Sequence, residues 1–76
     1  GIEAVLSSMI EYRAVFALQV AAIDMVFEVA HTGETAKERI TAAGGVETIS
    51  STLKAHILQE AFVEKGVAAL RVIRSG

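Results

Sequence analysis

The side chains best suited to chemistry near neutral pH are those of the two histidines, His31 and His56. An imidazole can bind a metal ion or transfer a proton. A protein metal site needs three or four ligands, and the sequence offers no cysteine and no third ligand beside either histidine. Each histidine follows a stretch with helical spacing. Both are therefore predicted to lie at a helix C-terminus or on the surface, and no metal or other cofactor is expected.

Two further groups of polar residues have a spacing that chemistry could use. Asp24 and Glu28 are four residues apart, as paired carboxylates for acid–base work could be, but no His, Lys or nucleophile accompanies them. The run Ser50-Ser51-Thr52 has no adjacent base and no loop that could stabilise an oxyanion. We expect a solvated carboxylate face and exposed hydroxyls on a helix, so the sequence predicts no catalytic residue and no enzyme.

The aromatic residues and the paired glycines also have structural interpretations. The aromatic residues are too scattered to stack on nucleic-acid bases and are predicted to lie in the core or an interface; they are Tyr12, Phe16, Phe27 and Phe62. Gly44-Gly45 lacks the lysine and the preceding strand of a phosphate-binding loop. We predict that these two glycines form a turn.

Composition narrows the class of protein. Seventy-six residues make one domain, residues 1–76, and 53% of them are hydrophobic. The net charge is −2 and no Lys/Arg cluster appears, so no nucleic-acid partner is expected. Residues 10–29 contain five charged or amide side chains, so no membrane-spanning helix is expected. No basic segment precedes an apolar core, so we predict a soluble protein without a signal peptide.

The longest apolar stretch is Ala14–Ile23, in which Gln19 is the only polar residue. A surface helix keeps a polar face, so a helix with this composition is predicted to be buried nearly all round. We expect it to form the centre of the core, with the other elements packed on it. Gln19, if buried, should have a hydrogen-bond partner, because an unpaired buried amide is costly.

Apolar spacing and turn residues predict an all-α protein, a compact five-helix bundle. Gly33 is expected to end one helix, Thr35 and Glu38 to form a capping box for the next, and Gly44-Gly45 to end that one. Gly66 lies inside a helix, where we expect a close approach by a neighbouring helix. The predicted helices cover residues 2–12, 14–31, 35–43, 45–55 and 58–74.

The apolar face changes sides near residues 13 and 57, which leaves two assemblies open. If the chain bends at both places, the five helices can close as a compact monomer. If it does not bend, residues 2–31 and 45–74 form two long helices whose apolar faces one chain cannot cover, and a two-fold homodimer is expected. The only partner that the sequence suggests is thus a second copy of the chain.

The two ends of the chain match at an offset of 44 residues. Gly1-Ile2-Glu3 aligns with Gly45-Val46-Glu47, Ser7 with Ser51, Met9 with Leu53, Ala17 with Ala61, and Ile23, Val26 and Val29 with Val67, Leu70 and Ile73. A period in the forties with several helices per unit is typical of armadillo and HEAT repeats.

Several segments resemble the armadillo-repeat family. GIEAVLSSM and AAGGVETISSTLKAH resemble the second helix of the repeat with its preceding Gly-Gly turn, and VEKGVAALRVI resembles the third helix. The resemblance covers about one and three-quarter repeats. It implies a right-handed helical solenoid that binds extended peptides in a groove.

The chain departs from that family in three places. His56–Glu60 stands where the family has a polar loop with proline, and Val72 and Glu28 stand where it has an asparagine that holds the ligand backbone. A solenoid also needs about three repeats, and this chain holds fewer than two. We therefore predict a closed bundle, an engineered or de novo designed helical scaffold with no natural ligand and no catalysis. The alternative is a peptide- or protein-binding armadillo fragment.

Overall fold

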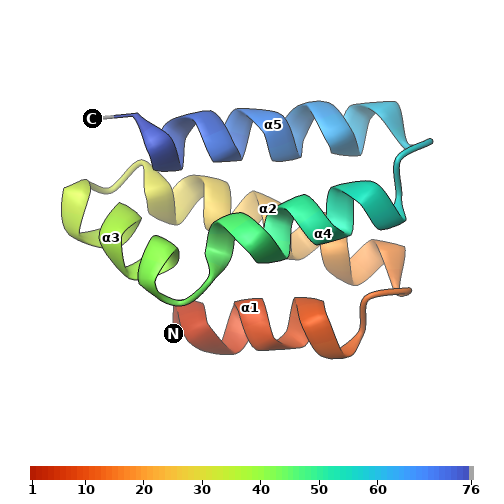
Figure 1. Ribbon diagram of the computed structural model, residues 1–76, viewed down its shortest axis with the longest axis horizontal. Helices are drawn as coiled ribbons and strands as arrows, with labels where there is room; N and C mark the ends of the chain where they lie inside the picture. The colour runs from red at the N-terminus through yellow and green to blue at the C-terminus, as the bar shows by residue number, and fades with distance from the viewer. Residues whose placement is uncertain (76) are drawn as a thin grey trace.

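The computed structural model describes residues 1–75, and within this range the chain forms five helices and no strand. They are α1 (Ile2–Glu11), α2 (Phe16–Ala30), α3 (Glu34–Ala42), α4 (Gly45–Ala55) and α5 (Glu60–Arg74). Figure 1 shows α1 antiparallel to α2 and α4 antiparallel to α5. The predicted all-α bundle is confirmed.

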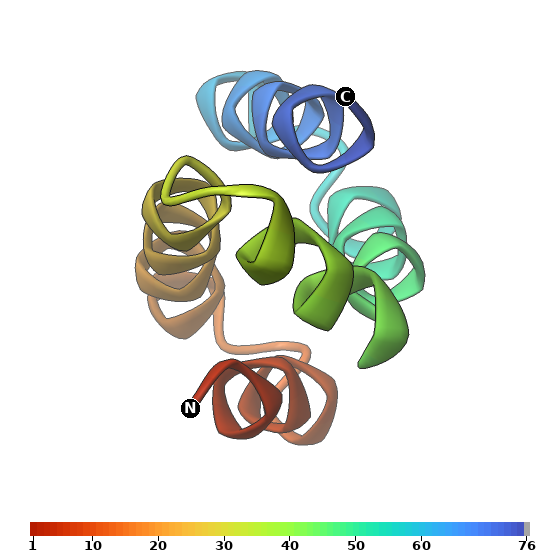
Figure 2. The same cartoon turned by 90° about the vertical axis from the view of Figure 1, so that its left-hand side faces the viewer.

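Four helices surround the core and the fifth closes one end of it. Viewed along the bundle, α1, α2, α5 and α4 follow one another around the core, and α3 crosses in front of them (Figure 2). The apolar stripes of all five helices meet inside. The core consists of Ile2, Leu6, Met9, Ala22, Ile23, Val26, Ala30, Ile40, Ile49, Leu53, Phe62, Ala69 and Ile73.

The prediction of a central helix buried nearly all round is wrong. Helix α2 is one wall of the bundle, and it begins at Phe16 rather than at residue 14. Val15 is 49% exposed and Val20 is 37% exposed. Because four helices share the core, each one buries only a single stripe. The stripe of α2 is Gln19, Ala22, Ile23, Val26 and Ala30.

Both bends that the sequence left open form, and they have nearly the same backbone. The C-cap residue of α1 is Tyr12 (φ −112°, ψ 43°) and that of α4 is His56 (φ −123°, ψ 39°). The next helices follow Val15 (φ −85°, ψ 97°) and Gln59 (φ −90°, ψ 86°). Each bend is closed by one backbone bond, Val15 N–H to Tyr12 O at 2.9 Å and Gln59 N–H to His56 O at 3.0 Å. The continuous long helices are therefore not the structure of this chain.

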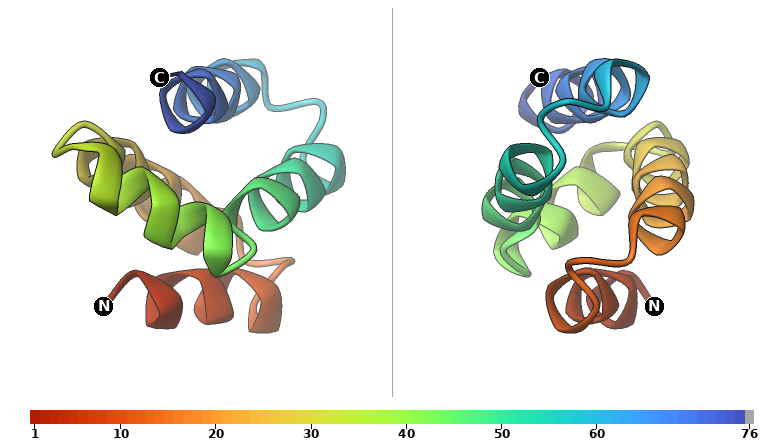
Figure 3. Two further views of the ribbon diagram at one scale, coloured as in Figure 1. Left: turned by 60° about the vertical axis from the view of Figure 1, so that its left-hand side comes forward. Right: turned by 90° about the vertical axis from the view of Figure 1, so that its right-hand side faces the viewer.

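The two bends lie at the same end of the molecule, as the right panel of Figure 3 shows. Helix α5 begins at Glu60 rather than at residue 58, so Leu58 lies in the second bend instead of on a helix face. Leu58 is 90% exposed there.

One glycine permits a turn and two others allow close helix packing. Gly44 has φ 82° at the α3–α4 turn, which favours glycine, and Gly45 opens α4. A Cβ on Gly45 would lie 2.7 Å from the carbonyl oxygen of Ile40. A Cβ on Gly66 would meet the side chain of Leu53, so the predicted close approach at Gly66 is confirmed.

The predicted capping box at the start of α3 is wrong. Helix α3 begins at Glu34, its N-cap is Gly33 at φ 148°, and no side chain bonds the cap. Gly33 adopts a backbone conformation that glycine tolerates easily, and this lets α3 begin directly after it at Glu34. Thr35 therefore lies inside α3 and cannot be its N-cap.

Candidate functional site

The most highly organised polar group in the structure is centred on Gln19, which is completely buried. Its amide Nε2 donates to Met9 O at 3.2 Å and to Tyr12 O at 3.0 Å. The hydroxyl of Thr52 donates to its Oε1 at 2.9 Å. The last carbonyls of a helix have no partner within that helix. Gln19 therefore caps the end of α1 from α2 and also ties both helices to α4, and the expectation of a partner for Gln19 is confirmed.

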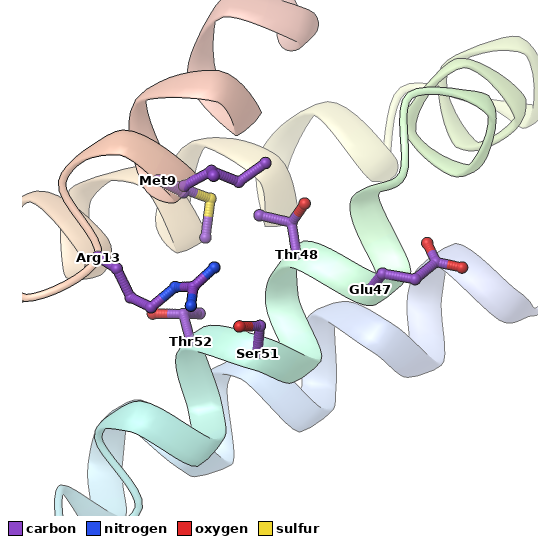
Figure 4. Close-up of a pocket in the computed structure, with 7 residues that line it drawn as sticks. Met9, Arg13, Glu47, Thr48, Ser51 and Thr52 are labelled. Atoms are coloured by element: carbon purple, nitrogen blue, oxygen red, sulfur yellow. The ribbon is translucent and has the colours of Figure 1, made fainter.

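A groove of about 260 Å³ lies next to this group, between α1 and α4. It is lined by Met9, Ile10, Arg13, Glu47, Thr48, Ser51 and Thr52. In Figure 4 the Arg13 side chain extends toward the part of α4 that carries Ser51 and Thr52, whereas the Glu47 carboxylate points away. The Thr52 hydroxyl is committed to Gln19, and the lining contains no imidazole. The Ser51 hydroxyl in the groove therefore has no imidazole beside it.

The prediction of exposed hydroxyls on α4 is wrong. Thr52 is only 2% exposed, and Ser50 and Ser51 are half-buried. Thr48 is also buried, and its Oγ1 donates to Gly44 O at 2.9 Å. The signal in the sequence was the i, i+4 pair of threonines, since β-branched hydroxyls can pack like valine once their hydrogen bonds are satisfied.

The two histidines lie at helix C-termini, as predicted. His31 follows α2 and His56 follows α4, and Figure 1 places these helix ends at opposite ends of the bundle. His31 Nδ1 is 2.8 Å from Phe27 O, and His56 Nε2 is 2.9 Å from Arg13 O. A carbonyl only accepts, so each of these ring nitrogens carries the proton. Among residues 1–75 no three His, Asp or Glu side chains gather closely enough to hold a metal ion.

The carboxylates of α2 are exposed, as predicted, but one of them has a cationic neighbour. Asp24 Oδ1 is 3.4 Å from Lys65 Nζ on α5, and this ammonium lies 4.5 Å from the centre of the Phe27 ring. Glu28 is exposed. Sequence spacing missed Lys65 because it comes from a distant helix. An exposed ion pair of this kind contributes little to stability.

The aromatic residues gather mainly where α2 and α5 meet. The rings of Phe16 and Phe62 are 5.2 Å apart between centroids, and the His56 ring packs on both. Phe62 is buried and Phe27 is half-buried, so the core assignment holds for them. Tyr12 is 49% exposed. A groove of about 380 Å³ follows this contact, lined by Phe16, Val20, Ile23, Asp24, Gln59, Ala61, Phe62 and Lys65.

One carboxyl has a shifted pKa. The pKa of Glu3 is lowered from its ordinary value, first by a hydrogen bond from its own backbone N–H at the start of α1 and then by Arg39 of α3. Arg39 Nη2 is 3.5 Å from Glu3 Oε1, and both side chains are largely exposed. This pair connects α1 to α3 at the surface, where Arg39 also lines a groove over α1 and α2.

Comparison with known proteins gives no relative for the chain. No protein-family model, no curated protein and no solved structure matches it. Among the helices that the structure describes, none has both the length and the apolar composition needed to cross a bilayer.

Proposed function

We propose that the chain is a helical scaffold, of engineered or de novo origin, with no natural ligand and no catalytic activity. The observation that carries this proposal is the use made of its polar side chains. Gln19 and Thr52 tie α1, α2 and α4 together, and His56 joins the two bends through Arg13 O. The groups best suited to chemistry are thus occupied in holding helices together.

The regularity of the chain supports a designed origin. Helices α2 and α5 have bounds that differ by 44 residues, and the bends before them share their backbone angles. The connections are short, and the sequence contains no Pro and no Asn, two common turn residues. A scaffold built from one helical hairpin used twice would have these properties.

The second candidate is a peptide-binding armadillo fragment. It is favoured by the groove of about 380 Å³ between α2 and α5, because the resemblance places the ligand groove of that family along its third helices. The groove combines the apolar surface of Phe16 and Val20 with the carboxylate of Asp24. A basic extended peptide could bind there by displacing Lys65, which also lines the groove and pairs with Asp24 at 3.4 Å.

A calorimetric titration with extended Lys/Arg-rich peptides separates the two candidates. The scaffold proposal expects heats that never saturate up to millimolar peptide. Saturable binding that is weakened tenfold or more by Asp24→Asn, but not by Glu38→Gln on α3, would replace it with the peptide-binding function. Asp24 lines the groove between α2 and α5, whereas Glu38 lies elsewhere on the surface.

A further inference from the structure

Within residues 1–75, one apolar face of the first hairpin, α1 with α2, is only partly covered. A groove of about 430 Å³ runs over α1 and α2 beside α3, and its lining includes Met25, which is 51% exposed. We call the residues of the two helices that turn toward this side the α1–α2 outer face. They are Gly1, Ala4, Val5, Met25 and Val29, which line the groove, and Leu18, which lies seven residues before Met25 on the same face of α2; all are exposed or half-buried.

The equivalent face of the second hairpin, α4 with α5, is covered within the chain. The residues 44 positions after those of the α1–α2 outer face are Gly45, Thr48, Ile49, Phe62, Ala69 and Ile73. All of these residues are buried. They are covered by the first hairpin, since α1 packs on α4 and α2 packs on α5, together with α3. At equivalent positions, the cover within the chain is thus another hairpin of the same kind together with α3, whose Ile40 packs on Gly45.

The residues through which the first hairpin packs on the second have counterparts that define an outer face of α4 and α5. The first hairpin packs on the second through buried residues that include Ile2, Leu6, Gln19, Ile23 and Val26. Their counterparts at an offset of 44 form the α4–α5 outer face, and each is half-buried or exposed, with Val67 37% exposed. This face consists of Val46, Ser50, Val63, Val67 and Leu70.

We propose that a second copy of the chain docks head to tail, with the α4–α5 outer face of one copy on the α1–α2 outer face of the next. The contact would continue the packing that already joins the two hairpins within the chain. Within the chain, the Asp24–Lys65 ion pair spans the contact between the hairpins. In the contact between copies the equivalent positions are Ala68 and Ala21, so no charge is left without a partner there.

The head-to-tail contact allows more than two copies to associate. Two different faces meet, so each added copy leaves one face of each kind free, and association continues beyond a dimer unless the rotation between copies closes a ring. Within the chain, α3 fills the space beside the two hairpins, and residues 1–75 supply no equivalent helix at a junction between copies. We therefore expect the intermolecular contact to be weaker than the internal one and the assembly to grow with concentration.

Two single substitutions test the pairing of the faces. Met25→Lys places a charge on the α1–α2 outer face, and Val67→Lys places one on the α4–α5 outer face. Val20→Lys is the matched control, because Val20 has the same 37% exposure as Val67 but lines the groove between α2 and α5 within the chain. Circular dichroism checks that each variant stays folded, and Met25→Gln and Val67→Gln replace any lysine variant that does not.

Sedimentation equilibrium over a hundredfold dilution then gives the outcome. For the unmodified chain and for Val20→Lys, we expect a mass that rises with concentration beyond twice the chain mass of 8.0 kDa. Each face variant alone should stay at 8.0 kDa, and an equimolar mixture of the two should give a dimer that grows no further. A single 8.0 kDa species for the unmodified chain at every concentration would overturn the proposal. A stable dimer formed by either face variant alone would also overturn it, because that result requires a two-fold contact.

Discussion

The hydrogen bond between Thr52 and Gln19 should contribute measurably to stability, and Thr52→Val tests it. Valine keeps the shape of threonine but removes the donor, so the Oε1 of the completely buried Gln19 loses its 2.9 Å partner. An unpaired buried acceptor costs about 1–3 kcal/mol. We expect the free energy of unfolding to fall by that amount. In a domain of this size, each kcal/mol lowers Tm by about 4–8 °C.

A double-mutant cycle assigns the loss to this bond. Gln19→Met should cost more than Thr52→Val, because Met9 O loses its donor from Gln19 in addition. The double variant should be less destabilised than the sum of the two single variants, by about 1–2 kcal/mol, since neither partner is then left unpaired. Urea denaturation followed by circular dichroism at 222 nm measures all four proteins.

Thr48→Val is the matched control for this cycle. Thr48 lies on the same helix and is also buried, but its hydroxyl donates to Gly44 O of its own chain segment rather than to another helix. We expect a smaller loss and no coupling to Gln19→Met. The reasoning would be refuted if the free energy of unfolding of Thr52→Val lay within about 0.3 kcal/mol of that of the unmodified protein. It would also be refuted if the losses of the two single variants simply added in the double variant.

Three further changes test the packing and the surface charge. Gly45→Ala should lower the free energy of unfolding by about 1–3 kcal/mol in urea melts, because the new Cβ would be forced against Ile40 O. Ile23→Ala should cost about 2–5 kcal/mol in the same melts, because Ile23 is completely buried. The lowered pKa of Glu3 predicts stability that is present above the unfolded pKa of about 4.3 and is lost as the pH falls through the lower folded value. Melts between pH 2 and 7 should therefore show a shallower acid loss for Glu3→Gln.

The sequence predicted the elements of the fold better than their arrangement. Apolar spacing and the glycines at 33, 44 and 45 located all five helices, with the main errors at the starts of α2 and α5. The central position expected for Ala14–Ile23 failed for a physical reason. An apolar helix rich in alanine can be fully buried, or it can expose small apolar side chains at little cost. Local composition does not distinguish these two cases, whereas the number of neighbouring helices does.

The candidate site was only partly visible in the sequence. Gln19 stood out because it was the single polar residue in an apolar stretch, and that contrast correctly predicted a buried amide with a partner. Its partner Thr52 was placed on a wet surface instead, because it sits in a run of hydroxyl residues on a helix. A contact between residues 33 positions apart in the chain has no local signature.

The bends show most clearly why the two assemblies stayed open at the level of sequence. No Pro or Gly marks either bend, and the one local hydrogen bond in each joins backbone groups that any sequence has. The first bend is held from outside its own segment, since Gln19 bonds Tyr12 O and His56 bonds Arg13 O. The second bend has the same backbone angles although its Leu58 is 90% exposed. The conformation of both bends is held by tertiary contacts, since His56 of the second bend bonds Arg13 O of the first, and it can be located in the sequence by the shift of the apolar face. It cannot be established without the helices that pack on it.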